Sequence, residues 1–275
     1  MNDNTATGGR PRWWVEISIT LVFYAIYSTV RNQFGSAIGG TIRDRSLLNA
    51  ERVIDFERAL HLFHEQWIQR QFIDYDWFIR FWNIFYGSFH FAVTLGAMVF
   101  LFRRHPVRYL RMRSALASTT ALALVGFATF PLMPPRLLEN SVSQFGGRQT
   151  GYGFVDTLIE PGGLWSFDSG TLETISNQYA AMPSLHIAWA AWCVVALYPV
   201  LRSRYARILT VAYPFMTLFA IIVTANHYWI DAVGGLVALA VGLIAAPHVE
   251  RLLPGLSATL QPEPGRLVSQ AGTDR

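Results

Sequence analysis

The sequence contains no lysine and a single cysteine, and charged residues make up only 15% of its 275 positions. One cysteine excludes an intrachain disulfide and a zinc site built from cysteines. The arginines occur in short clusters, which argues against the broad basic surface of a nucleic-acid-binding protein. Because 52% of the residues are hydrophobic, the composition indicates an integral membrane protein.

Six stretches contain the ~20 mostly apolar residues that a helix needs to cross a bilayer. They are residues 13–33, 79–102, 114–133, 182–201, 206–226 and 230–248. The first follows Arg10 and Arg12, as a signal peptide would, but its length and the lack of a clear A-x-A site favour an uncleaved span. We therefore expect an all-α polytopic fold in which residues 13–250 form one membrane domain.

Arginine clusters predict how these spans are oriented. The loop after the second span and the loop after the fourth are short and basic, with Arg103, Arg104, Arg108, Arg111, Arg113, Arg202, Arg204 and Arg207. Short basic loops stay in the cytoplasm. Residues 1–12 and the disordered tail 251–275 are then cytoplasmic. The long loops 34–78 and 134–181 face outward from a cell membrane.

The first external loop contains "LLNAERVIDFERALHLFHEQWI", which has apolar residues at helical spacing. It predicts one amphipathic helix that lies on the outer membrane surface or caps the bundle, with an apolar face of Val53, Ile54, Leu60 and Phe63 and with Trp67 beyond. The second loop, rich in glycine, serine and threonine at 141–178, is longer than an unstructured connection usually is unless it is functional.

Polar residues next to the membrane are the candidate site residues, because ionisable groups at that depth are costly. In "PLMPPRLLEN", Arg136 follows two helix-ending prolines. This stretch alone favours an arginine that snorkels to the headgroups, and phosphate binding is the alternative. Asn83, Tyr86, Gly87 and His90 form a polar stripe on one helix face. Hydrogen bonding between helices is the favoured interpretation, and a headgroup pocket is the alternative.

Two further motifs combine histidine with other polar groups. In "AAMPSLH", Pro183 suits the first helical turn, and Ser184 and His186 share that turn with free N–H groups that attract anions. In "HYWIDAVGG", His227 and Asp231 are four residues apart and would share a helix face. A carboxylate beside an imidazole fixes its tautomer, although a purely structural pair is also consistent with this spacing.

Taken together, these residues resemble the type 2 phosphatidic-acid phosphatase (PAP2) superfamily. "PSLH" is similar to its PSGH motif with Leu185 in place of glycine, and "HYWID" to the end of its SR-x5-H-x3-D motif. Ile221 replaces the arginine of that last motif, the lysine of the first motif has no counterpart, and Arg136 stands for its arginine. The stretches "AERVIDFERALHLFHE", "NIFYGSFHF" and "FPLMPPRLL" add a resemblance to bacterial relatives of the fungal inositol phosphorylceramide synthase, over roughly residues 50–245.

The resemblance implies a chemistry without metal or cofactor. His227 would attack phosphorus to form a phosphohistidine, Asp231 would orient it, and His186 would act as general acid and then as base. Arg136 and Ser184 would bind the phosphate, and His90, Asn83 and Tyr86 remain a possible headgroup pocket. The partners implied are a lipid phosphate substrate and membrane lipids, with no nucleic acid.

We predict a metal-independent lipid phosphate phosphatase that acts at the outer membrane face. A phosphotransferase that moves a headgroup, as inositol phosphorylceramide synthase does, is the alternative. A non-enzymatic lipid-binding or transport protein is a third possibility, although such folds usually contain paired, related halves and the sequence has no repeat. The identity of the lipid, the phosphoryl acceptor and the oligomeric state do not follow from the sequence.

Overall fold

The computed structural model describes residues 40–140, 145–147, 151–159 and 178–252, together with positions 13, 14, 16–18, 21, 25 and 29. Its helices are α2 (Gly40–Ala59), α3 (Glu65–Phe72), α4 (Asp76–Arg104), α5 (Pro106–Thr129), the 3₁₀ turn η1 (Pro135–Leu137), α7 (Leu185–Leu197), α8 (Arg204–Val223) and α9 (Trp229–Leu252). Within these ranges the only strand-like pairing is a single parallel bridge between Leu132 and Ala180. The predicted all-helical class is confirmed for this part of the chain.

Three helices, α4, α8 and α9, are long and apolar enough to cross a membrane. The predicted span at 182–201 is shorter than expected, because α7 has 13 residues and is ~20 Å long at 1.5 Å per residue. The predicted span at 114–133 lies mostly in α5, which ends at Thr129 and whose first turns carry Arg108, Arg111 and Arg113. Most of the predicted span at 13–33 lies outside the described residues. Six membrane-spanning helices are therefore not established, whereas three candidate spans are.

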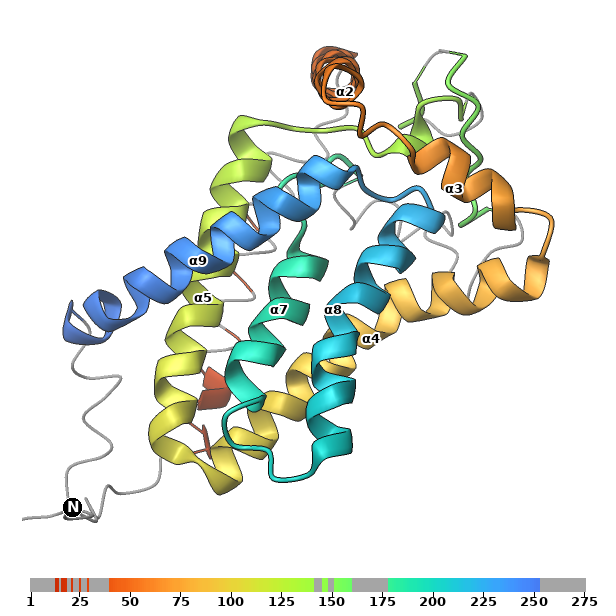
Figure 1. The fold of residues 1–275 in the computed structure, drawn as a ribbon. Coiled ribbons are helices and arrows are strands. Elements are labelled where there is room, and N and C mark those ends of the chain that lie inside the picture. Colours follow the sequence, from red (N-terminus) through yellow and green to blue (C-terminus); the bar gives the residue numbers. More distant parts are fainter. Residues whose placement is uncertain are drawn as a thin grey trace, which may run out of the picture.

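Helix α7 lies at the centre of the bundle and packs against α4, α5, α8 and α9 (Figure 1). Four of its small residues, Ala188, Ala190, Cys193 and Ala196, are buried, which lets the neighbouring helices approach closely. Trp192 fills the remaining space and donates its indole N–H to the Met112 carbonyl of α5 at 2.9 Å. The central position of α7 places its first residues next to several other elements.

Helices α2 and α3 lie together at one end of the bundle (Figure 1), where a single amphipathic helix was expected. That expectation is wrong because the chain turns after Ala59. His61 adopts a left-handed conformation with φ of 57°, and the Leu62 N–H donates to the Glu57 carbonyl at 2.8 Å. These are the features of a Schellman helix end. Trp67, predicted beyond the apolar face of that helix, is 62% exposed on α3.

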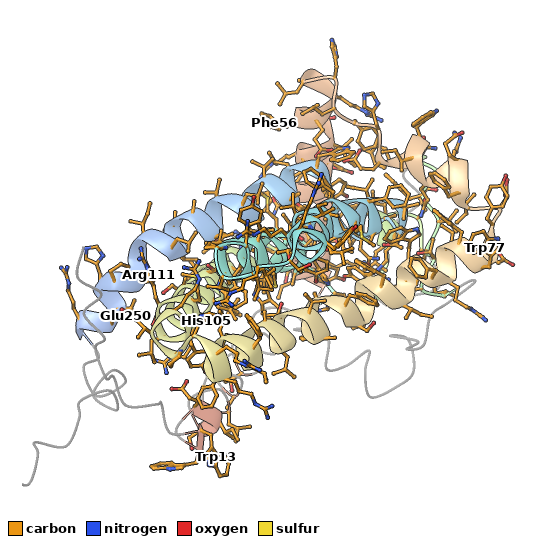
Figure 2. All side chains as sticks on the ribbon, turned by 60° about the horizontal axis from the view of Figure 1, so that its bottom comes forward. Trp13, Phe56, Trp77, His105, Arg111 and Glu250 are labelled. Carbon is orange, nitrogen blue, oxygen red and sulfur yellow. The ribbon has the colours of Figure 1, made fainter. Side chains whose placement is uncertain are left out.

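The basic connections lie at the other end of the bundle. Figure 2 shows His105 and Arg111 at one end of the molecule and Trp77, which lies in the first turn of α4, at the other end. In this region Arg108 donates to the carbonyl groups of Ala196 and Val195, at 2.8 and 2.5 Å, at the carboxyl end of α7. A cation there satisfies free carbonyls and complements the helix dipole. At least one of these arginines therefore also stabilises a helix end.

Candidate active site

His227 and Asp231 meet at the connection between α8 and α9. The Nδ1 atom of His227 lies 3.2 Å from Oδ2 of Asp231, and the same oxygen accepts the N–H of Tyr228 at 3.0 Å. Asp231 is the third residue of α9. Its carboxylate reaches back to the N–H of Tyr228, the residue before the helix, and this contact forms half of a capping box. The pair is close for this reason and not because both residues share a helix face, since His227 precedes α9.

A tight reversal after α8 positions His227. Ala225 is left-handed, with φ of 52°, a conformation that is uncommon for a residue with a Cβ. The N–H groups of Asn226 and His227 both donate to the Ile221 carbonyl, at 3.0 and 3.2 Å. His227 is 3% exposed, so both its backbone and its ring are fixed by the surrounding structure.

The "PSLH" stretch reaches this histidine from α7. Pro183 lies outside α7, after a cis peptide bond, so the expectation that it occupies the first helical turn is wrong. Ser184 is instead the residue before the helix, and its N–H donates to the Asp231 carbonyl at 2.9 Å. Its hydroxyl lies 3.5 Å from Nε2 of His227, and Nδ1 of His186 lies 3.3 Å from the same nitrogen. Three of the predicted site residues therefore surround one imidazole.

Two glycines of α9 allow this close approach. A Cβ on Gly235 would overlap the backbone carbonyl oxygen of Ser184, and a Cβ on Gly234 would lie 3.3 Å from Cβ of Pro183. Here they bring the helix that carries Asp231 against the turn that carries Ser184 and His186.

Helix α4 supports His186 from the side. The ring of Tyr86 stacks on His186 with centroids 4.3 Å apart, and the ring of His90 meets the same histidine edge-on at 4.3 Å. The Nδ1 atom of His90 is 2.9 Å from the Tyr86 carbonyl oxygen. Asn83, on the same predicted stripe, is buried and instead donates to the Thr157 carbonyl at 2.6 Å. The stripe therefore contributes to the site and also anchors a loop.

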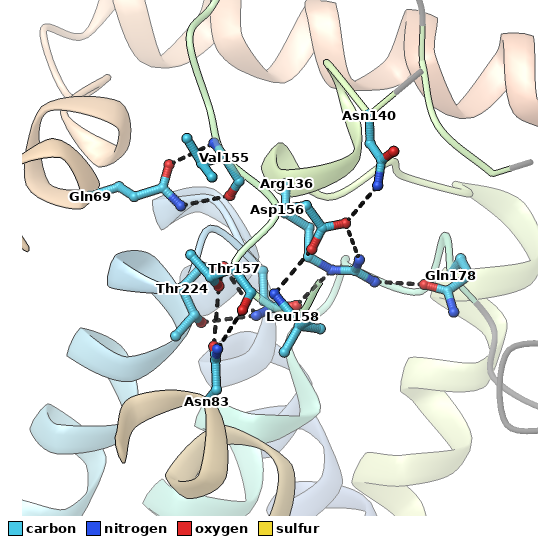
Figure 3. Close-up of polar contacts among 11 residues, drawn as sticks. Gln69, Asn83, Arg136, Asn140, Val155, Asp156, Thr157, Leu158, Gln178 and Thr224 are labelled. Carbon is cyan, nitrogen blue, oxygen red and sulfur yellow. Dashed lines mark hydrogen bonds and ion pairs between the residues drawn. The ribbon is translucent and has the colours of Figure 1, made fainter. Parts of the chain in front are cut away.

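Arg136 extends from the turn η1 into a buried polar network (Figure 3). Its guanidinium donates to Asn226 at 3.0 Å, to Asp156 at 2.9 Å and to Gln178 at 2.6 Å. The residue is only 6% exposed, so it does not snorkel to the membrane surface. Because Asn226 precedes His227 directly, the network connects the arginine to the histidine site.

The segment 151–159 presents Asp156 to this network (Figure 3). Gln69 exchanges two hydrogen bonds with the backbone of Val155, at 2.9 and 3.0 Å, and the Thr157 hydroxyl lies 3.1 Å from Oδ1 of Asn83. Three members of the network, Asp156, Gln178 and Asn226, were not among the predicted site residues. The position of Asn226 next to a motif histidine was the one available signal.

A cavity of about 110 Å³ opens between these groups. Its polar lining consists of Tyr86, Arg136, Gln178, His186, Asn226 and His227. Four other predicted site residues do not line the cavity: Asn83, His90, Ser184 and Asp231. Across the described residues, no group of three or more His, Cys, Asp or Glu side chains is placed to hold a metal ion. The cavity thus brings two imidazoles and a guanidinium together, a combination suited to an anionic, phosphorylated group.

Comparison with known proteins identifies the family. A family model described as the PAP2 superfamily matches residues 51–245. This range covers well over half of the chain, and the protein therefore belongs to the PAP2 superfamily. Membership indicates a phosphatase or phosphotransferase type of function on lipid phosphates. No curated protein and no solved structure gives a significant match.

Proposed function

We propose that this protein is a lipid phosphate phosphatase in which His227 is the nucleophile. The observation that carries the proposal is the placement of the His227 ring. Its Nδ1 contacts Asp231, its Nε2 lies 3.3 Å from Nδ1 of His186, and the residue lines the cavity. A carboxylate at Nδ1 holds the proton on that nitrogen and leaves the lone pair of Nε2 available.

In the first half of the reaction, the lone pair of Nε2 attacks phosphorus and forms a nitrogen–phosphorus bond. The bond from phosphorus to the lipid oxygen breaks, and its electron pair leaves with that oxygen. His186 gives the oxygen a proton, so the lipid departs as an alcohol. Asp231 stabilises the positive charge on the phosphorylated imidazole of His227, with which it is already in contact.

In the second half, His186 accepts a proton from water while the water oxygen attacks phosphorus. The nitrogen–phosphorus bond breaks, its electron pair returns to Nε2 of His227, and inorganic phosphate is released. Both histidines then regain their starting protonation states, so the cycle balances. One general acid–base group close to the nucleophile is sufficient for both steps, as the 3.3 Å contact between the rings supports.

Arg136 supplies charge stabilisation in this proposal. Three of its five N–H groups donate to Asn226, Asp156 and Gln178, which leaves two for the phosphate oxygens. The fixed guanidinium therefore meets the developing charge without having to reorganise. Ser184 does not line the cavity, but its hydroxyl lies 3.5 Å from Nε2 of His227. In this proposal it becomes a further hydrogen-bonding group when the phosphate is attached to that nitrogen.

The proposed location of this site is the outer face of a cell membrane. The connections after α4 and α7, which are basic, lie at one end of the bundle, and the starts of α7 and α9 lie at the other end (Figure 1). His186 and His227, which line the cavity, lie at these starts. If short basic loops remain cytoplasmic, the cavity faces outward at the level of the lipid headgroups. The substrate would keep its tails in the bilayer.

A phosphotransferase of the inositol phosphorylceramide synthase type is the second candidate. Its first half-reaction is the same, and an alcohol replaces water in the second. Two departures from the wider superfamily pattern favour this candidate: the chain has no lysine, and Ile221 stands where that pattern has arginine. In the structure Ile221 is completely buried, and its carbonyl holds the reversal before His227.

The test is a panel of lipid phosphates labelled on phosphorus, with and without alcohol acceptors. We expect free phosphate as the product, and label trapped on the wild-type protein after acid-free quenching. His227→Ala should abolish both, while His248→Ala, at an exposed position late in α9, should change neither. Transfer of label to an alcohol would favour the phosphotransferase. Full turnover by His227→Ala on every lipid that the wild type cleaves would refute the mechanism, and lipid binding without turnover would indicate a non-enzymatic protein.

A further inference from the structure

Two buried glutamates from the external helices hold the start of α9. Oε1 of Glu57, on α2, accepts the N–H of Ile230 at 2.8 Å. Oε1 of Glu65, the first residue of α3, accepts the N–H of Trp229 at 3.2 Å. Glu57 is 1% exposed and Glu65 is fully buried. These acceptors satisfy the first two free N–H groups of the helix, which otherwise have no partner within it.

The second carboxyl oxygen of each glutamate is the observation that points to a pair. Oε2 of Glu57 and Oε2 of Glu65 are buried and receive no N–H or O–H donor from the described residues. Burial and the neighbouring carboxyl group of Glu65 raise the pKa of Glu57 far above its ordinary value. A carboxyl group that keeps its proton can donate it to the neighbouring carboxylate, which satisfies both oxygens.

The helix end that this pair caps is the one that carries the proposed chemistry. Trp229 and Ile230 lie between His227 and Asp231, so any displacement of their backbone moves the Nδ1–Oδ2 contact. Nothing else described for α9 accepts these two N–H groups. The pair also places a net negative charge at the amino end of a helix, where it is favourable.

We propose that Glu57 and Glu65 share one proton and act as a positioning pair, which fixes His227 and Asp231 by capping the first turn of α9. This inference rests on the proposed function for its catalytic consequence, but the capping itself does not depend on it. It gives α2 and α3, which do not line the cavity, a direct role in setting the geometry of the site.

The conservative substitution is Glu57→Gln. Glutamine accepts the Ile230 N–H through its oxygen and donates its amide N–H to Glu65, so it mimics the protonated carboxyl group. Glu57→Ala leaves the Ile230 N–H without an acceptor and Glu65 without its donor. Asp55→Asn, at an exposed position on the same helix, is the matched control.

We expect Glu57→Ala to lower kcat about tenfold or more with KM within about threefold, because the lost interaction concerns the reacting groups and not lipid binding. Glu57→Gln should stay within about threefold of wild type in kcat. It should also keep its activity at alkaline pH, where the wild type loses the shared proton. Glu65, Asp231 and Tyr228 are the titratable groups that face Glu57, and all are retained in this variant.

Amide hydrogen exchange over residues 228–235 tests the capping independently of turnover. Exchange at Trp229 and Ile230 should be faster in Glu57→Ala and unchanged in Glu57→Gln and Asp55→Asn. Should Glu57→Ala not fold, Glu57→Asp provides the same comparison, because it shortens the side chain by one methylene. The proposal would be overturned if Glu57→Gln lowered kcat and accelerated exchange as much as Glu57→Ala or Glu57→Asp does. It would also be overturned if Glu57→Ala left both exchange and kcat unchanged. A wild type that cleaves no lipid phosphate would refute the proposed function, while the exchange data would still decide the capping.

Discussion

Replacing Gly235 by alanine is expected to separate α9 from the start of α7. The added Cβ would overlap the carbonyl oxygen of Ser184, and a backbone atom cannot turn away as a flexible side chain can. Gly234 faces Pro183 at the same contact, but its Cβ would be 3.3 Å away, so a shift of a few tenths of an ångström suffices there. Gly235→Ala is therefore expected to displace α9 from the start of α7 further than Gly234→Ala, although both add the same atom.

The size of the effect follows from the contacts that cross this boundary. Restoring an ordinary separation requires a movement of about 1 Å, and overpacking of this kind costs roughly 1–3 kcal/mol. The movement stretches the 2.9 Å bond from the Ser184 N–H to the Asp231 carbonyl and the 3.3 Å contact between His186 and His227. A misplacement of about 1 Å near reacting groups lowers the rate by about 10²-fold.

The assay compares Gly235→Ala, Gly234→Ala and Gly96→Ala for lipid phosphate turnover and thermal unfolding in the same detergent. Gly96 lies within α4, and a Cβ there meets no atom within 4 Å, so this variant reports only the change in helix propensity. We expect turnover to fall about 10²-fold for position 235, severalfold for position 234 and hardly at all for position 96. Wild-type turnover by Gly235→Ala would show that the close approach of α9 to Ser184 does not set the geometry of the site.

Arg136→Lys should lower kcat/KM for a lipid phosphate about 10²-fold, since one ammonium group cannot replace the fork that joins Asp156, Asn226 and Gln178; unchanged kinetics would contradict the role of that network. The raised pKa of Glu57 means that the folded state binds a proton that the unfolded state releases near pH 4.5, so the stabilisation is complete below that pH and declines toward alkaline pH. The free energy of unfolding should therefore fall as pH rises from 5 to 10, by up to about 1.4 kcal/mol per pH unit, and the melting temperature should fall with it. An equally steep fall in Glu57→Gln would assign the effect to other groups. Trp192→Phe should lower the free energy of unfolding by about 1–3 kcal/mol, measured by thermal unfolding, without changing KM. A large change in KM would show that the centre of α7 affects substrate binding.

Hydrophobic patterning was sufficient for the elements that depend on it. Helices α4, α8 and α9 coincide with predicted spans because long apolar segments have few alternatives to a helix. The convergence of His186 and His227 was expected from two motifs and a topology that placed them at one end of the bundle. In the structure their rings meet at 3.3 Å.

Features that depend on local backbone conformation or on long-range polar contacts were not predictable. The apolar spacing across residues 47–68 continues through the break at His61, so it gave no sign of the two helices α2 and α3. Asp156 lies in a loop whose Gly, Ser and Thr content does not single out one residue, and its contact with Arg136 spans 20 residues. Glu57 lies in an amphipathic pattern that suggests a solvated face, yet its partner N–H is 173 residues away. Such contacts depend on tertiary packing between distant segments, and no local sequence pattern indicates them.

The Asp231 carboxylate completes a helix terminus and contacts the His227 ring through a single oxygen atom, Oδ2. The contact that caps α9 is therefore also the contact that orients the imidazole. Under the proposed mechanism, a chain in which α9 has not yet formed at Trp229 has no oriented histidine and would be inactive until this helix docks. Any substitution of Asp231 would therefore change the cap of α9 together with the partner of His227.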